Sequence, residues 1–285
     1  MNSGTKLEVL LEGLKFGEGP RWREGKLWFS DFYVHRVATV GLDGRDETIV
    51  EVPQRPSGLG WTAKGELLVV SMLDRRVLRF DGKALHLHAD LSQLAGGLCN
   101  DMVVDAAGRA YVGNFGYDRH NDAPPRDTRI IRVDPDGRNA TFVGDDLHFP
   151  NGMVITPDGR TLIVAETFAH RLTAFDVAAD GALGNRRLFA ALDGIFPDGI
   201  CLDAEGAVWV ADARGRSVTR VLPGGRIAQA VDTGPERCSY ACMLGGPDRR
   251  TLFVITNTGS GPKMAEKSDG RIEIVRVDVP GAGLP

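Results

Sequence analysis

The sequence predicts an all-β protein, a six-bladed β-propeller that forms one domain over residues 1–285. Three observations predict this fold: one pattern of strands and turns occurs six times, the copies follow at a steady interval, and an unmatched strand lies near the N-terminus. The residues that open the six copies are Gly19, Gly58, Asp101, Gly152, Gly199 and Ala241. Successive opening residues are about 40 to 50 residues apart, which is the period of propeller blades with four short strands each.

Each copy contains a short apolar segment rich in β-branched and aromatic residues, as expected of a strand that is buried on both faces. These segments are residues 25–31, 65–72, 108–115, 160–167, 206–212 and 250–257. A further strand follows each segment at a steady offset and leads to a turn with Gly or Asp. Fourth strands can be placed after the first five copies, for example at residues 47–52, 84–89 and 186–192.

The sixth copy has no fourth strand before the sequence ends at Pro285, whereas residues 6–13 form an apolar strand ahead of the first copy. We expect this N-terminal strand to complete the last blade and close the ring, so that no long sheet edge stays unpaired. A β-sandwich has turns at similar intervals, but it does not predict an unmatched strand at the opposite terminus. The strand patterns also exclude a helical solenoid.

Composition and charge exclude several classes of partner. The formal net charge is −4 and no Lys/Arg cluster occurs that could follow a phosphate backbone, so no nucleic-acid partner is expected. No apolar stretch is long enough to span a membrane and the first residues lack a signal-peptide pattern, so we expect no membrane contact and a cytoplasmic protein. The four cysteines lack the paired spacing of a structural zinc site, and we expect them to be reduced and mostly buried.

The residue just before each opening position is expected to face the mouth of the central channel. These residues are Glu18, Ser57, Asn100, Asn151, Asp198 and Tyr240. Four of the six carry a carboxylate or a carboxamide, which are the oxygen ligands that hard divalent cations prefer. Two carboxylates facing each other in a narrow channel without a cation would be costly, so the pattern predicts a metal site.

The alternative is that Asn151-Gly152 and Asp198-Gly199 are tight-turn dipeptides, as Asn-Gly and Asp-Gly pairs usually are. Against it, near-identical F-P-[ND]-G-[MI] segments stand at equivalent positions of two copies, and F-G-E-G-P at 16–20 matches them in the first copy. The shared feature is a side chain able to bind a ligand, so the repeats favour a functional site.

Three segments carry a resemblance to a known family. They are EGP at 18–20 followed by Trp22, PNGM at 150–153 followed by TPDGRTLIVAET, and PDGICLDAEGAVWVAD at 197–212. Together they resemble the SMP-30/gluconolactonase/luciferin-regenerating enzyme family of calcium- and zinc-dependent lactonases, and the resemblance extends from Glu18 to about Asn257. It implies that Glu18, Asn151 and Asp198 bind the metal and that Asn100 lies beside it, in contact with substrate or a water molecule.

The function expected is therefore hydrolysis of a small-molecule lactone, with one divalent metal that polarises the carbonyl group or a water molecule. Asp198 is the candidate general base. Oxygen-only ligands favour Ca²⁺, although Zn²⁺, Mn²⁺ or Fe²⁺ can occupy the same positions. Two alternatives stay open: hydrolysis of phosphotriesters or fluorophosphates on the same metal, and a non-catalytic propeller that serves as a binding platform.

Three further features concern the substrate. Sugar-lactone hydrolases of this family often carry an arginine two positions before the residue matching Asn100, where this chain has Leu98, so we expect a less hydroxylated lactone. His148, three residues before Asn151, is a second candidate for the pocket wall. The polar segment 116–127 lengthens the third copy and is either a lid over the channel or a tolerated insertion.

Overall fold

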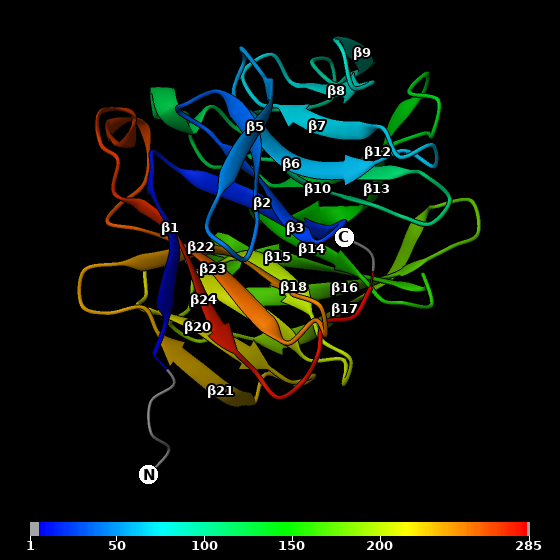
Figure 1. Ribbon diagram of the computed structural model, residues 1–285. Coiled ribbons are helices and arrows are strands. Elements are labelled where there is room, and N and C mark those ends of the chain that lie inside the picture. The colour runs from blue at the N-terminus through cyan, green and yellow to red at the C-terminus, as the bar shows by residue number, and fades with distance from the viewer. Residues whose placement is uncertain (1–5, 284–285) are drawn as a thin grey trace.

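Six antiparallel sheets of four strands each surround a common axis in the computed structural model, which describes residues 6–283 (Figure 1). The innermost strands are β2 (Gly17–Arg23), β6 (Pro56–Trp61), β10 (Cys99–Val104), β14 (Pro150–Ile155), β18 (Pro197–Leu202) and β22 (Cys238–Gly245). Each inner strand contacts the next one along the chain, and β22 contacts β2. The prediction of an all-β, six-bladed propeller is confirmed.

The second strand of each blade coincides with the predicted apolar segment to within two residues. These strands are β3 (Lys26–Asp31), β7 (Leu67–Ser71), β11 (Ala110–Asn114), β15 (Thr161–Glu166), β19 (Val208–Asp212) and β23 (Thr251–Asn257). The third strands are β4 (Arg36–Val40), β8 (Arg76–Phe80), β12 (Thr128–Val133), β16 (Arg171–Val177), β20 (Ser217–Val221) and β24 (Gly270–Arg276). The fourth strands of the first five blades are β5 (Asp46–Glu51), β9 (Leu85–Asp90), β13 (Ala140–Leu147), β17 (Leu183–Ala191) and β21 (Ile227–Asp232).

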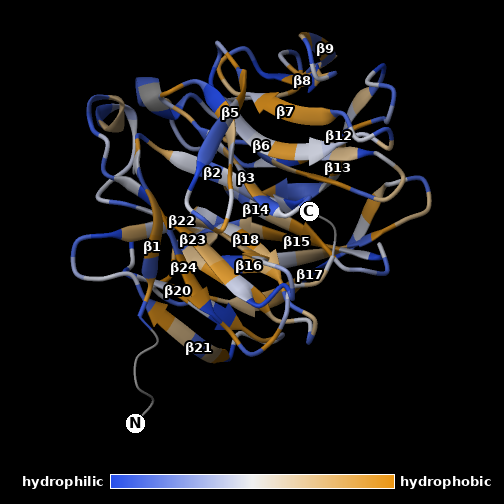
Figure 2. Ribbon diagram, viewed as in Figure 1, coloured by the Kyte–Doolittle hydropathy of each residue, from blue (hydrophilic) through white to orange (hydrophobic). Residues whose placement is uncertain are grey.

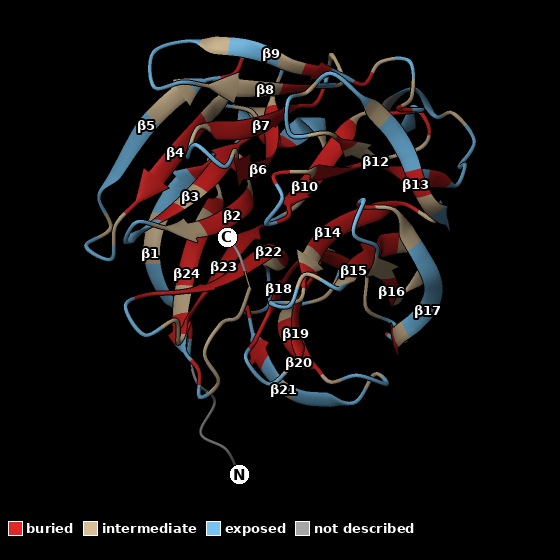
Figure 3. Ribbon diagram, turned by 90° about the vertical axis from the view of Figure 1, so that its right-hand side faces the viewer, coloured by how far each residue is buried: buried red, intermediate tan, exposed pale blue. Residues whose placement is uncertain are grey.

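Burial falls from the axis to the rim of the propeller (Figure 3). Every residue of β6, β10 and β18 is buried, whereas β17 and β21 are mostly exposed. The strands close to the axis are also the more hydrophobic ones in several blades, for example β7 and β15 (Figure 2). The second strands are packed on both faces and need apolar side chains. Their sequence pattern is therefore continuous rather than alternating.

The N-terminal strand β1 (Glu8–Leu14) pairs antiparallel with β24 and is the outer strand of the sheet that contains β22 and β23. Its register runs from Glu8 opposite Ile274 to Leu14 opposite Gly270. Leu14 is buried in the core cluster of this blade, whereas most of β1 is exposed or half-buried. That this pairing is what holds the ring closed stays a prediction.

The glycines after the site residues lie within strands and not in tight turns. Gly152 belongs to β14 and Gly199 to β18, and each of these strands has an irregularity in its register at this point. A Cβ atom at Gly152 would lie 2.5 Å from the carbonyl oxygen of Asp198, because the backbones of adjacent inner strands nearly touch. The tight-turn interpretation of these dipeptides is therefore wrong: a close approach between blades requires glycine here.

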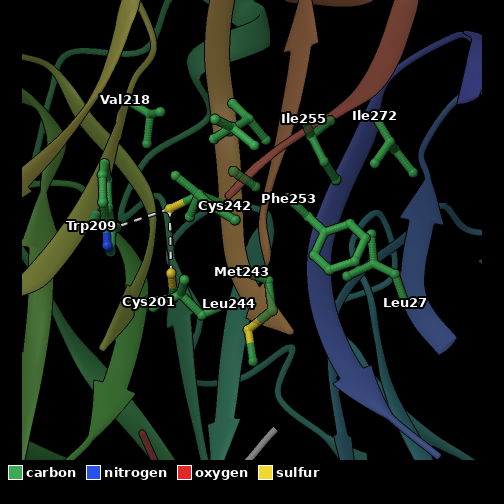
Figure 4. Close-up of a cluster of buried hydrophobic side chains, with 14 of the residues drawn as sticks. Leu27, Cys201, Trp209, Val218, Cys242, Met243, Leu244, Phe253, Ile255 and Ile272 are labelled. Atoms are coloured by element: carbon green, nitrogen blue, oxygen red, sulfur yellow. Dashed lines mark hydrogen bonds between the residues drawn. The ribbon is translucent and has the colours of Figure 1, made fainter. Parts of the chain in front are cut away.

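Side chains of neighbouring blades fill the space between sheets (Figure 4). In the largest cluster Cys242 of β22 faces Cys201 of β18, with 3.8 Å between the two sulfur atoms, and its thiol lies 3.5 Å from the carbonyl oxygen of Trp209. All four cysteines are free, and Cys238 alone is only half-buried. Three of the four cysteines are buried, as predicted, and Cys201 and Cys242 pack as small apolar residues between blades.

Helical structure in the described part of the chain consists of short 3-10 turns: η1 (Arg119–Asn121), η2 (Thr167–Ala169) and η3 (Pro262–Glu266). Across residues 6–283 no helix has the length and apolarity needed to cross a membrane. The 3-10 turns matter for the site, because η1, η2 and η3 each contribute side chains or backbone to one cavity.

Replacing Gly152 by Ala should lower the free energy of unfolding by about 1–3 kcal/mol, because the new methyl group meets backbone atoms of β18 that have no room to move. The matched control is Gly184→Ala in β17, where a Cβ atom would meet nothing within 4 Å. Urea unfolding of both variants checks the expectation. Equal midpoints for Gly152→Ala and Gly184→Ala would contradict the close packing of the inner strands.

Deletion of residues 1–13 should lower the melting temperature or cause aggregation, because the paired edge of β24 would become a free edge and the half-buried residues of β1 would no longer cover the blade. Thermal unfolding and size-exclusion chromatography of the truncated chain test this. An unchanged melting temperature would show that β1 is dispensable for closing the ring.

Candidate active site

One cavity of about 230 Å³ lies at the end of the propeller where the inner strands begin. Glu18, Asn100, Asn151 and Asp198 line it, and each is the second residue of its inner strand. We call these four residues the oxygen cluster. The structure thus brings together side chains from four blades that the repeat alignment placed at equivalent positions.

A chain of hydrogen bonds orients the two carboxamides. The Ser57 hydroxyl donates to Oδ1 of Asn100 over 3.4 Å, and Nδ2 of Asn100 donates to Oδ1 of Asn151 over 2.8 Å. Nδ2 of Asn151 donates to the Thr167 hydroxyl over 3.2 Å, and this hydroxyl donates to the carbonyl oxygen of Pro197 over 2.8 Å. Each carboxamide oxygen accepts one bond and keeps a second lone pair, so both can still contact a ligand in the cavity.

The two carboxylates of the oxygen cluster are electrostatically strained. Burial raises the pKa of Glu18 well above its ordinary value, and the charges of Asp198 and Asp101 raise it further. Burial also raises the pKa of Asp198, with the charge of Asp101 as the next contribution, and a hydrogen bond from Asn151 acts in the opposite direction. Both carboxyl groups therefore favour the protonated form unless a positive charge compensates them.

Arg21, the buried cation whose charge acts on Glu18, is already engaged. Arg21 of β2 forms an ion pair with Asp101 of β10 at 3.0 Å and also donates to the carbonyl oxygens of Pro20 and Met102. Its charge lowers the pKa of Glu18, but burial and the charges of Asp198 and Asp101 have larger effects. The charge deficit of the oxygen cluster is thus left for a ligand to fill.

The donor set fits a hard divalent cation by its chemistry. It offers carboxylate and carboxamide oxygens, which suit Ca²⁺ and related ions. Within residues 6–283 no group of three or more His, Cys, Asp or Glu side chains is placed to hold a metal ion. A cation at the oxygen cluster would therefore depend on the amide side chains as well as on the two carboxylates.

Carboxylates at the ends of the second strands hold the segments that enter the cavity. Asp31 accepts a hydrogen bond from the backbone nitrogen of Phe16 at 3.0 Å, and Asp212 accepts one from Phe196 at 3.1 Å. Phe16 and Phe196 both stand two residues before an oxygen-cluster residue, and both line the cavity. Phe149 has the equivalent place before Asn151 and adopts a left-handed backbone with φ of 57°, which is unusual for a bulky residue.

Aromatic rings form much of the cavity wall. Phe149 stacks on Phe115 with 4.5 Å between ring centroids and lies 4.7 Å from the ring of Phe168, while Phe16 lies 4.8 Å from Tyr240. All five residues line the cavity. The wall therefore offers apolar surface to a ligand and limits the access of water to the oxygen cluster.

Leu98 and His148, the other two predicted substrate contacts, do not line this cavity. Leu98 is partly buried and packs on a hydrophobic cluster that includes the wall residues Phe16 and Tyr240, and its carbonyl oxygen accepts a hydrogen bond from the backbone nitrogen of Phe115 at 3.0 Å. His148 is partly exposed, and its ring bonds the Asp127 carboxylate at 2.7 Å. The inference from Leu98 that the substrate is less hydroxylated stays a prediction.

Three arginines that the sequence analysis did not single out also line the cavity: Arg55, Arg119 and Arg214. We call them the arginine cluster. A sequence signal existed for Arg55, which stands two residues before Ser57 and so occupies in the second blade the place that Leu98 has in the third. Arg119 belongs to the segment 116–127, which supports placing this segment at the cavity, while its action as a lid stays a prediction.

A profile of the SMP-30/Gluconolactonase/LRE-like region matches residues 16–258, from just before β2 to the end of β23. The chain belongs to this family. The match includes all six inner strands and all members of the oxygen and arginine clusters. It confirms the resemblance seen in the sequence.

Other members of the SMP-30/gluconolactonase family are similar along nearly the whole chain. A 6-deoxy-6-sulfogluconolactonase from Pseudomonas putida is 28% identical, with 100% of this chain and 99% of the relative covered. The pentonolactonase XacC from Haloferax volcanii is 31% identical, with 99% and 97% covered. The structure of a calcium-binding protein, regucalcin, from Agrobacterium tumefaciens strain C58 superposes with a TM-score of 0.81 at 23% identity, covering 99% of this chain and 96% of that one, and shows the same fold.

Proposed function

We propose that this protein is a metal-dependent lactonase that hydrolyses a cyclic ester at the oxygen cluster. The observation that carries the proposal is the pair of buried carboxylates, Glu18 and Asp198, which share one cavity with two oriented carboxamides. Membership of the SMP-30/gluconolactonase family supports it, as do relatives named as lactonases.

Glu18, Asn151 and Asp198 would hold the ion, with Ca²⁺ favoured because every donor is an oxygen atom. The raised pKa values of both carboxyl groups support this assignment, because burial outweighs the charges of Arg21 on Glu18 and of Arg119 on Asp198. When bound, a divalent ion supplies Lewis-acid stabilisation for the negative charge that develops on the lactone carbonyl oxygen.

Asp198 is proposed as the general base. Its carboxylate takes a proton from the water that attacks the carbonyl carbon. The ring C–O bond then breaks, the proton passes from Asp198 to the leaving ring oxygen, and a hydroxy acid results. Asn100 would orient the water or the ester oxygen, because its carboxamide is fixed between Ser57 and Asn151. The aromatic wall would hold the ring of the lactone and keep bulk water away from the reacting atoms.

The cavity sets the size of the substrate. At about 230 Å³ it is smaller than the pockets of about 300–1,000 Å³ that take drug-sized ligands. We therefore propose a lactone of five or six carbons as the substrate. The names of the relatives, a sulfogluconolactonase and a pentonolactonase, support this range.

Replacing Asp198 by Asn should reduce kcat for lactone hydrolysis by about 10²- to 10⁴-fold with the fold intact, because a carboxamide cannot accept the proton. The rates are followed with a pH indicator on a panel of γ- and δ-lactones. Asp136→Asn, an exposed acid in the turn between β12 and β13, is the control and should keep full activity. Substantial turnover by Asp198→Asn would place the base on another residue.

Calcium should raise the melting temperature of the protein, because an ion that binds only the folded state stabilises it by about 2.7 kcal/mol at 100 times its Kd. Thermal unfolding in excess Ca²⁺ is compared with unfolding in EDTA. Glu18→Gln should lose most of the shift, whereas Glu47→Gln, an exposed partner of Lys26, should keep it. If Ca²⁺, Zn²⁺, Mn²⁺ and Fe²⁺ all leave the wild-type melting temperature unchanged, the oxygen cluster is not a metal site.

A further inference from the structure

The arginine cluster places three positive charges at the cavity without acidic partners. Arg55, Arg119 and Arg214 come from three different connections: the one between β5 and β6, the segment 116–127, and the one between β19 and β20. Among residues 6–283 none of the three forms an ion pair with a carboxylate, although most arginines of the blades do. Their guanidinium groups are thus available to a ligand.

Aromatic rings of the wall hold these guanidinium groups in place. The Cζ atom of Arg55 lies 4.7 Å from the ring centroid of Tyr33, and that of Arg214 lies 4.4 Å from Phe196. Arg119 and Arg214 lie 5.4 and 5.6 Å from the same ring, that of Phe168. Stacking of a planar guanidinium group on the face of a ring holds the group in place. The N–H donors at the edge of the guanidinium group stay free to bind a ligand.

Arg55 shows two further signs of a binding role. Its backbone adopts the left-handed region with φ of 69°, a conformation that is unfavourable for a non-glycine residue. Its Nε atom is buried and has no hydrogen-bond partner within the described part of the chain. A buried, unsatisfied donor in a cavity wall calls for an acceptor supplied by a ligand.

The charge balance of the cavity indicates the sign of that ligand. Glu18 and Asp198 carry at most two negative charges, against three positive charges of the arginine cluster. A divalent cation at the oxygen cluster would use both carboxylates and leave the three guanidinium charges uncompensated. Two of those cations gather at one ring, Phe168, where their mutual repulsion is unfavourable unless an anion lies between or beside them.

We propose that the substrate is a lactone with a second, anionic group, a carboxylate, sulfonate or phosphate, and that Arg55, Arg119 and Arg214 bind this group. The inference rests on the proposed lactonase function. Guanidinium groups match the oxygen atoms of such anions with paired, charge-assisted hydrogen bonds. The anion would then hold one end of the substrate at the arginine cluster while the ester faces the oxygen cluster, so that charge fixes the orientation of the ring.

Two matched pairs of lactones test the preference. D-Glucaro-1,4-lactone carries a C6 carboxylate where D-glucono-1,4-lactone has a hydroxymethyl group, and 6-phosphoglucono-1,5-lactone differs from glucono-1,5-lactone by its phosphate. We expect kcat/KM to be about 10- to 100-fold higher for the charged member of at least one pair, in line with the strength of hydrogen bonds to charged groups. The pair that responds distinguishes a planar carboxylate from a tetrahedral oxyanion.

Variants of the arginine cluster connect the preference to these residues. Arg55→Gln, Arg119→Gln and Arg214→Gln should each lower the charged-to-neutral ratio of kcat/KM, mainly through KM of the charged lactone, and the triple variant should bring the ratio near one. Arg138→Gln removes an exposed arginine from the turn at the other end of the third blade and should leave the ratio unchanged.

A binding experiment separates this inference from the proposed hydrolysis. Isothermal titration of metal-free protein with glucose 6-phosphate and with glucose measures anion binding with compounds that have no ester ring to open. If no lactone is hydrolysed but glucose 6-phosphate binds in wild type and not in the triple variant, the lactonase proposal fails and the anion site stands. If neither the turnover ratio nor the binding depends on the three arginines, the anion site is overturned, whatever the lactonase activity.

Discussion

The close approach of the inner strands around one axis is the constraint on which the site depends. The backbones of β14 and β18 come so near that only glycine fits at Gly152, and the same contact carries Asp198 to the cavity beside Asn151. The register irregularity that follows the second residue of these strands directs the site residue out of the regular pleat. The packing of the inner strands and the position of the site residues therefore depend on the same contact. A substitution that loosens this contact also displaces the site residues.

This constraint has an electrostatic consequence. Residues at equivalent positions of different blades are forced together whatever their charge, so Glu18 and Asp198 meet in a buried site with raised pKa values. In an ordinary core this arrangement would be replaced by apolar side chains. Here the six well-packed blades tolerate it, and the strained backbones of Arg55 and Phe149 lie at the same cavity. Unfavourable local conformations are typical of functional sites, where the surrounding structure holds them in place.

Cavity walls and cavity charges come from different parts of each blade. Phe16, Phe149 and Phe196 enter from the segments before the inner strands, where carboxylates of the second strands hold the first and the last of them. Arg55 comes from the same kind of segment in the second blade, Arg214 from the short connection between β19 and β20, and Arg119 from the long connection between β11 and β12. The inner strands thus build the oxygen cluster, while connections between strands add the charges that would distinguish one substrate from another.

The sequence by itself determined the number of blades and the positions of the second strands. It also determined which residue of each inner strand faces the axis. These features repeat, and a repeated pattern of apolar residues and turns is a local property that can be counted along the chain. Only the tertiary structure decided which further side chains reach the cavity. Leu98 is absent from the cavity lining and His148 bonds Asp127, because the direction of a side chain depends on what packs around it. Arg119 and Arg214 share the ring of Phe168 across long sequence separations. Arg119 belongs to a long insertion in the third blade that follows no repeat, so no pattern along the chain could have placed it beside Arg214.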